Sequence, residues 1–232
     1  MSSQVPLLLA TYLCIGTAQV LLASVGKTAS NILLHPTSRR LSYTPPPRVE
    51  NLKNYMETLP RLGKYQDAWK FITTNTTLHL YMRSYEHDLM YGNDSRCVKA
   101  NLLDVTDDVV TVDLSYIDSN HINVHFVSYF RKNTSQGYNV SNILLGSYDR
   151  DKEGYPYPMV FSDYKTCGIV RIPHYDREGQ PACQLWAMGD RVRSVKRCCL
   201  FVYELLCGPN KCNIYDAKKC NYEEKHDVVM EE

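Results

Sequence analysis

The chain has 232 residues, enough for one domain with extensions. Its 26 Lys and Arg residues nearly balance 25 Asp and Glu residues, which argues against a nucleic-acid-binding protein, because such proteins gather an excess of basic side chains on one face. Apolar residues make up 44% of the sequence, so the chain can bury a core and is not disordered throughout. We expect a folded protein that is rich in tyrosine (18) and cysteine (9).

The first 26 residues have the features of a secretion signal. No charged residue lies between Val5 and Gly26, and the stretch from Leu7 to Ile15 is almost wholly apolar. Small residues follow, so we expect cleavage after Ala18 or Gly26. A membrane anchor is the alternative, because the uncharged run is just long enough to cross a bilayer. Polar residues dilute the run, so we expect a secreted, extracellular protein with no membrane contact in its mature form.

An even number of cysteines remains behind that segment. They are Cys97, Cys167, Cys183, Cys198, Cys199, Cys207, Cys212 and Cys220. An even count in a secreted chain predicts disulfides, here four. Zinc is the alternative, but no C-x-x-C pair occurs, so we expect no metal site. N-x-S/T sequons, which predict glycosylation in the same compartment, lie at Asn75, Asn93, Asn133 and Asn139.

The two flanks of the expected domain differ in composition from its centre. Residues 27–61 carry six basic and two acidic side chains and the run Pro45-Pro46-Pro47, with no clear period, which predicts a flexible arm. A basic patch for heparin or a membrane is the alternative for this arm. Residues 221–232 include five acids and are predicted to form a solvated acidic tail.

Ordered sequence is expected to begin near Leu62. Tyr65–Ile72 has apolar residues at helical spacing, which predicts a short amphipathic helix. The period then changes to two, and strands are predicted at 76–84, 97–105, 108–116, 122–130, 140–148, 159–162, 167–173 and 182–188. Helical spacing returns in Val195–Cys207, where Gly208-Pro209 ends a predicted closing helix.

Eight short strands without room for helical crossovers must be joined antiparallel, which predicts an all-β sandwich or barrel. Several strands place Tyr and His opposite their aliphatic face. A barrel that encloses a cavity explains this pattern, because polar groups would be costly in a close-packed sandwich core. The alternation alone leaves both architectures open. Motifs of nucleotide-binding proteins, serine hydrolases and zinc proteases do not occur, and every cysteine can be paired, so we expect neither catalysis nor a cofactor.

Several short motifs occur together in one order along the chain. They are Y-Q-D-A-W-K at 65–70, G-N-D at 92–94 before Cys97, C-x-L-W at 183–186, C-C-x-F-x-Y at 198–203 and Y-D-x-x-x-C at 215–220. From about Leu62 to Cys220 the chain therefore resembles the tick salivary lipocalins, the family of the histamine-binding proteins. The resemblance implies an eight-stranded antiparallel lipocalin barrel, with a short helix before it and a second helix packed outside after the last strand.

The resemblance also implies which cysteines pair. It predicts the bridges Cys97–Cys220 and Cys167–Cys199. The remaining four cysteines would then form two more bridges, and the sequence does not choose among the three pairings of Cys183, Cys198, Cys207 and Cys212.

Members of this family sequester host mediators such as histamine, serotonin, fatty-acid-derived lipids or, in some branches, a complement protein. A protonated amine in a dry cavity needs carboxylates, because an unpaired buried ammonium is too costly. The resemblance places acids of the amine-binding members where this chain has Gly168 and Gln184. Two further acid positions align with Asn75 and Tyr129, so only Asp88 remains.

The resemblance thus predicts a ligand site made of Tyr85, Asp88, Tyr91, Tyr129, Gln184 and Trp186. Asp88 could instead be a solvated loop acid, and Trp186 could be a core residue. We expect a monomer that binds a small host mediator, a lipid in preference to an amine. A module of the same fold that binds a host immune protein, with a vestigial cavity, is the alternative.

Overall fold

The computed structural model describes residues 55, 57–91, 93–177 and 180–223. The predicted signal segment, most of the predicted arm and residues 224–232 of the predicted tail lie outside these ranges. Among the described helices, none is both long and apolar enough to cross a membrane.

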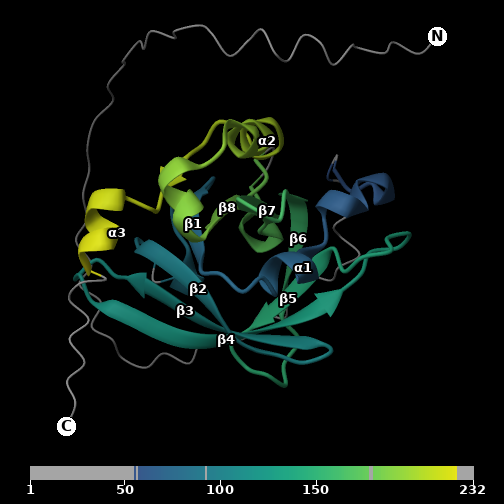
Figure 1. Cartoon of the computed structure of the whole chain (residues 1–232), viewed down its shortest axis with the longest axis horizontal. Helices are drawn as coiled ribbons and strands as arrows, with labels where there is room; N and C mark the ends of the chain where they lie inside the picture. Colours follow the sequence, from purple (N-terminus) through teal and green to yellow (C-terminus); the bar gives the residue numbers. More distant parts are fainter. Residues whose placement is uncertain (1–54, 56, 92, 178–179, 224–232) are drawn as a thin grey trace, which may run out of the picture. The chain divides into compact units, whose positions relative to one another are not determined.

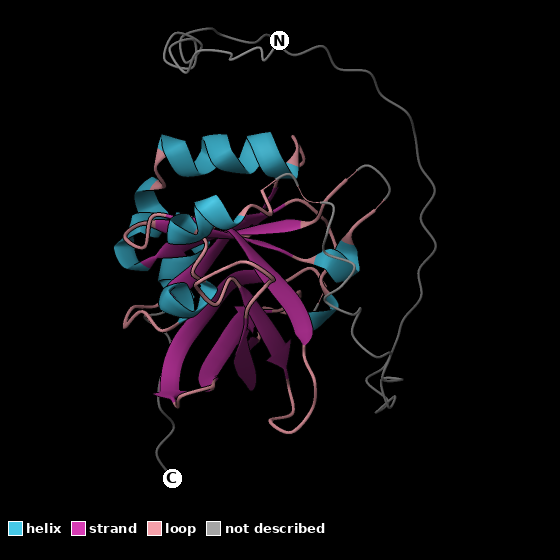
Figure 2. Cartoon of the chain, turned by 90° about the vertical axis from the view of Figure 1, so that its right-hand side faces the viewer, coloured by secondary structure: helices cyan, strands magenta, loops and turns pink. Residues whose placement is uncertain are grey.

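The described chain forms a closed antiparallel β-barrel (Figures 1 and 2). Its strands are β1 (Leu78–Arg83), β2 (Arg96–Val105), β3 (Val109–Ile117), β4 (Asn123–Asn133), β5 (Ile143–Ser147), β6 (Tyr155–Ser162), β7 (Cys167–Arg171) and β8 (Cys183–Met188). Each strand from β2 to β7 pairs with the next, β8 pairs with β1, and β1 pairs with β2 through Leu78–Ala100 and His79–Lys99. This last pairing closes the ring and decides for the barrel over the sandwich.

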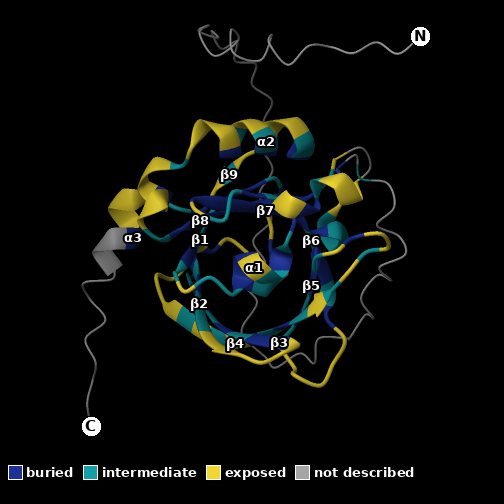
Figure 3. Ribbon diagram, turned by 45° about the vertical axis from the view of Figure 1, so that its right-hand side comes forward, coloured by how far each residue is buried: buried dark blue, intermediate teal, exposed yellow. Residues whose placement is uncertain are grey.

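Helix α1 (Ala68–Ile72) lies inside the ring of strands as seen in Figure 3, across one end of the barrel. The Asp67 side chain caps it by accepting a hydrogen bond from the Lys70 backbone N–H at 2.9 Å. At the opposite end, the loop between β1 and β2 carries a 3-10 turn, η4 (Leu89–Tyr91). A second 3-10 turn, η5 (Pro173–Tyr175), follows β7 at that end.

Two apolar cores lie on the two faces of the barrel wall. The inner core fills the barrel interior, and the outer core lies between β6, β7, β8 and helix α2 (Arg197–Cys207). The bridges Cys167–Cys199 and Cys183–Cys207 attach α2 to β7 and β8. The predicted closing helix outside the barrel is therefore present.

The bridge Cys97–Cys220 joins β2 to helix α3 (Ala217–Glu223). Both bridges implied by the resemblance are thus present, but the prediction of four bridges is wrong for the described chain. Cys198 and Cys212 are unpaired thiols. On α2, Cys199 faces the barrel and Cys198, about 100° further round the helix, is exposed. Burial raises the pKa of the Cys212 thiol.

The folded unit begins earlier than the predicted boundary at Leu62. The Glu57 carboxylate is buried and accepts a bond from Arg171 Nε of β7 at 2.6 Å. The Arg171 guanidinium also lies over the Tyr55 ring, 4.7 Å from its centroid. These contacts attach residues at the end of the predicted arm to the outer wall of the barrel.

Two elements near the C-terminus were not predicted. Strand β9 (Cys212–Asn213) pairs with β1 at Met82 and Arg83, outside the ring of eight strands. Helix α3 extends to Glu223, so the predicted acidic tail begins inside a helix.

Candidate functional site

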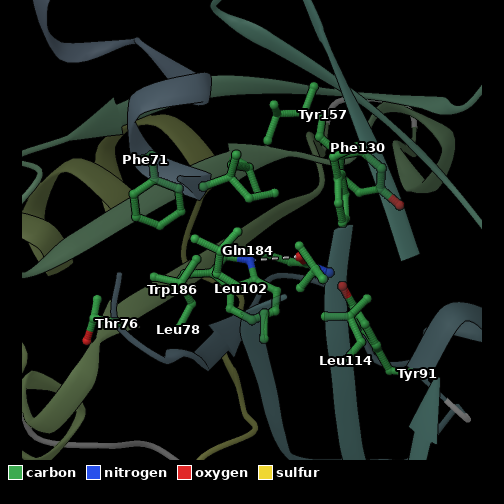
Figure 4. Close-up of a pocket in the computed structure, with 15 residues that line it drawn as sticks. Phe71, Thr76, Leu78, Tyr91, Leu102, Leu114, Phe130, Tyr157, Gln184 and Trp186 are labelled. Carbon is green, nitrogen blue, oxygen red and sulfur yellow. Dashed lines mark hydrogen bonds between the residues drawn. The ribbon is translucent and has the colours of Figure 1, made fainter. Parts of the chain in front are cut away.

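A cavity of about 50 Å³ lies inside the barrel, between α1 and η4 (Figure 4). That volume is equivalent to a few water molecules. Most of the described residues that line it are aliphatic or aromatic, and none is charged. Its few polar side chains are Thr76, Gln184 and the hydroxyl-bearing rings of Tyr91 and Tyr157. The site is therefore suited to an apolar group and not to an ion.

Phe71 of α1 lies where the resemblance placed a carboxylate. Gly168 pairs with Trp186 across β7 and β8, so both residues face the interior. A Cβ atom at Gly168 would lie 2.5 Å from two ring carbons of Phe71. The ring therefore occupies the space that any side chain at residue 168 would need.

Gln184, at the second lost acid position, belongs to a hydrogen-bonded chain along the wall. Its Nε2 donates to the Tyr85 hydroxyl at 2.6 Å and to Asp88 Oδ2 at 3.1 Å. Its Oε1 accepts from Trp186 Nε1 at 3.0 Å. The amide is thus satisfied by protein groups, and it separates the cavity from Asp88.

Asp88 is buried, with only 1% of its surface exposed, so the alternative of a solvated loop acid is wrong. Its carboxylate accepts hydrogen bonds from the Tyr85 hydroxyl at 2.6 Å and the Met90 backbone N–H at 3.0 Å, and from the Tyr175 hydroxyl at 3.4 Å. Burial raises the pKa of Asp88, although the Tyr85 hydrogen bond and the Arg83 charge oppose that rise.

The positive charge that faces Asp88 is Arg83, which is also buried. Arg83 Nη1 lies 3.7 Å from Asp88 Oδ2, and its other nitrogens donate to the carbonyls of Tyr85, Glu86 and Asn93. This pair holds the loop that carries η4 over the barrel end. Because Asp88 is neutralised within the protein, it is not free to bind a ligand ammonium.

Tyrosines surround the same end of the barrel. Burial raises the pKa of Tyr85, Tyr91 and Tyr157, so these hydroxyls are uncharged at neutral pH. Tyr85 stacks on Tyr175 with centroids 4.7 Å apart, and Tyr91 meets Trp186 edge to face at 6.3 Å. The result is an aromatic and uncharged wall.

The six expected ligand residues divide into three groups. Tyr91, Gln184 and Trp186 line the cavity, whereas Tyr85 and Asp88 lie behind Gln184. The prediction is wrong for Tyr129. On β4 its neighbour Phe130 lines the cavity, and successive strand residues face opposite sides, so Tyr129 faces outward.

Sequence reasoning missed Phe71, Phe130 and Tyr157, which line the cavity. Two glycines could have signalled them. Like Gly168, Gly146 lies against aromatic rings, since its Cβ would lie 2.7 Å from Phe130 and Tyr157. A glycine inside a strand often marks such a close approach.

The sequon asparagines are placed where a sugar could be attached, although their occupancy stays a prediction. Asn75, Asn93 and Asn139 are exposed, and Asn133 in β4 is half-buried. In the part of the chain that the structure describes, no group of three His, Cys, Asp or Glu residues could hold a metal ion.

A family model described as "Tick histamine binding protein" matches residues 56–222. The chain belongs to this family. It is similar to the "Male-specific histamine-binding salivary protein" of Rhipicephalus appendiculatus, with 22% identity over 150 residues, 61% of this chain and 72% of that protein.

Among solved structures, the chain resembles Japanin from Rhipicephalus appendiculatus bound to cholesterol, with 20% identity and a TM-score of 0.48, over 64% of this chain and 97% of that one. It also resembles the AM182 serotonin complex, with 13% identity and a TM-score of 0.47, over 65% of this chain and 90% of that one. Membership of the tick histamine-binding protein family thus rests on the match of the family model, which includes every strand of the barrel.

Proposed function

We propose that this protein is a secreted salivary lipocalin that sequesters a small, largely apolar host mediator, such as a fatty-acid-derived lipid, and thereby suppresses host inflammation and defence. In this role it is a glycosylated monomer, released by cleavage of its signal segment. The observation that carries the proposal is the chemistry of the central cavity, which is lined by apolar and aromatic side chains and by no charged side chain of the described residues.

The same observation disfavours a biogenic amine as the ligand. A buried ammonium needs a facing carboxylate, and the nearest candidate, Asp88, already pairs with Arg83 and lies behind Gln184. At the other position Phe71 fills the space above Gly168. Histamine in the name of one similar protein and serotonin in the structure of another describe those proteins. They do not identify the ligand of this chain.

A protein-binding module with a vestigial cavity is the second candidate. It is favoured by the volume of about 50 Å³, because pockets for drug-sized ligands occupy roughly 300–1,000 Å³. Leu89 of η4 is also 77% exposed at the barrel end, as an apolar contact residue for a partner would be.

Calorimetric titration separates these candidates. We expect stoichiometric binding of an uncharged lipid, probed with fatty alcohols of increasing chain length, and no micromolar binding of histamine or serotonin. Uptake of an amine would contradict the apolar assignment. If no small molecule binds while a host immune protein does, the second candidate replaces the first.

Two neighbouring leucines of β2 supply a matched pair of variants. Leu102 lines the cavity, and Leu103 is 56% exposed on the other face. We expect Leu102→Trp to fill the cavity and abolish lipid binding, and Leu103→Trp to leave binding unchanged. Equal effects of the two substitutions would place the lipid outside the barrel.

A further inference from the structure

We infer that Phe71 is a plug, seated on Gly168, that sets the depth of the cavity and hence the length of the apolar group that it accepts. The inference rests on the proposed function, because it concerns the same cavity. The maximum length of the bound group is then set by one side chain of α1 and not by the residues of the barrel wall.

The contact between Phe71 and Gly168 depends on glycine. A Cβ atom at residue 168 would lie 2.5 Å from Phe71 Cε2 and Cζ and 2.9 Å from Cδ2. Contacts of that length are not tolerated, so the ring would have to move for any other residue at this position. In the structure the ring is 3% exposed and contributes to the cavity lining.

The backbone of α1 holds the ring in place from outside the cavity. The Ala68 N–H donates to the Ser141 carbonyl at 2.8 Å, and the Asp67 N–H donates to the Tyr164 hydroxyl at 2.7 Å. The Asp67 side chain caps the helix. Because α1 is anchored at its start, the Phe71 ring is directed onto Gly168 and not toward solvent.

The surroundings of the ring define the chemistry that the space beneath it would accept. Ile72, Leu78 and Val170 line the cavity together with Phe71, so removal of the ring exposes apolar walls. Apolar cavities of this kind stay dry and bind apolar molecules. The group that Phe71 excludes is therefore a segment of an uncharged hydrocarbon chain.

A thermodynamic cycle tests the contact without any ligand. We expect Gly168→Ala to lower the thermal unfolding midpoint of the wild-type protein, because the methyl group collides with Phe71. In the Phe71→Ala background the same substitution should have little effect. An equal loss in both backgrounds would show that the ring is not seated on Gly168 and would overturn the inference.

Titration with straight-chain primary alcohols of four to fourteen carbons, which are uncharged probes, tests the consequence. Each methylene group that enters an apolar site should tighten binding about fourfold. For the wild-type protein we expect this gain to stop at a chain length that the Phe71 ring sets. For Phe71→Ala we expect the gain to continue to longer chains, and for Phe71→Leu to continue to an intermediate length.

Phe201→Ala is the matched control, since Phe201 lies on α2 outside the barrel and is 54% exposed. It should leave the length limit unchanged. If Phe71→Ala does not fold, Phe71→Leu still provides the shifted limit. If the gain in affinity stops at the same chain length in wild type and in the Phe71 variants, the inference about Phe71 is wrong and the proposed function still holds. Binding of no alcohol by any variant would contradict both.

Discussion

The two ends of the barrel are closed by different kinds of interaction. At the α1 end, Phe71 packs on Gly168 and the contacts are apolar. At the η4 end, a buried ion pair of Arg83 and Asp88 is surrounded by tyrosine hydroxyls. Apolar packing tolerates substitution in proportion to the volume lost, whereas a buried ion pair fails when one partner is removed. The comparison predicts that the η4 end is the more sensitive to single changes.

The largest effect is expected at the η4 end from Arg83→Met, which leaves Asp88 buried without a counter-charge. We expect a loss of about 3–5 kcal/mol in the free energy of unfolding, measured by urea denaturation. The double variant Arg83→Met/Asp88→Leu should lose less than Arg83→Met alone, because it removes both charges.

The matched control is Lys132→Met, which breaks an exposed ion pair with Asp108 at 3.0 Å. Exposed pairs contribute about 0–1 kcal/mol, so this variant should stay close to wild type. If Arg83→Met were as mild as Lys132→Met, the ion pair would not hold the η4 end and the contrast between the two ends would disappear.

The next effect is an acid sensitivity of the same end, through His174 of η5. Burial lowers the pKa of His174 from 6.5 to about 4, and its ring lies against those of Tyr155 and Tyr175 with centroids 4.7 Å away. Between these two pH values the unfolded chain takes up a proton that the folded protein refuses. Stability should therefore fall as the pH falls from 6.5 to 4, by at most about 3 kcal/mol, and His174 should cost nothing above that window.

The free energy of unfolding is measured across this pH range in wild type and in His174→Phe. The difference between the two proteins isolates the contribution of His174, because the other titrating groups are the same in both. Among these, the raised pKa of Asp88 acts with the opposite sign, since protonation there favours the folded state. The control is His87→Phe, at a histidine whose side chain is 57% exposed. A stability difference between wild type and His174→Phe that does not change with pH would contradict the burial of a neutral imidazole.

The smallest effect is expected at the α1 end from Asp67→Ala, which removes the cap of the five-residue helix. Loss of such a cap costs about 1 kcal/mol, readable as a small shift of the urea midpoint. Because α1 directs Phe71 into the barrel, the variant should also loosen the length limit for alcohol binding. A loss as large as that of Arg83→Met would remove the difference between the two ends.

Strands β3 and β4 could be predicted because one face of each is more buried than the other, so alternation is visible in the sequence. Closure could not be predicted from alternation, because it depends on two residue pairs between β1 and β2. The two-residue β9 is too short for any period, and α3 (A-K-K-C-N-Y-E) lacks an apolar stripe.

For the site, family resemblance brought attention to Gln184 and Trp186, which line the cavity, although their role in binding stays a prediction. It could not anticipate that Arg83 neutralises Asp88, because this contact depends on a bulge in β1 between Leu80 and Met82. After the bulge, Arg83 faces the interior beside Gln184, its partner in β8. Nor does periodicity reveal that a helix outside the strand pattern inserts Phe71 into the barrel.

The most direct test of the central claim is native mass spectrometry of the secreted full chain, mixed with equal amounts of histamine, serotonin and fatty alcohols of several chain lengths. The cavity chemistry predicts a one-to-one adduct with a fatty alcohol and none with either amine, and Leu102→Trp should lose that adduct. An amine adduct that displaces the fatty alcohol would contradict the assignment of an uncharged, apolar site.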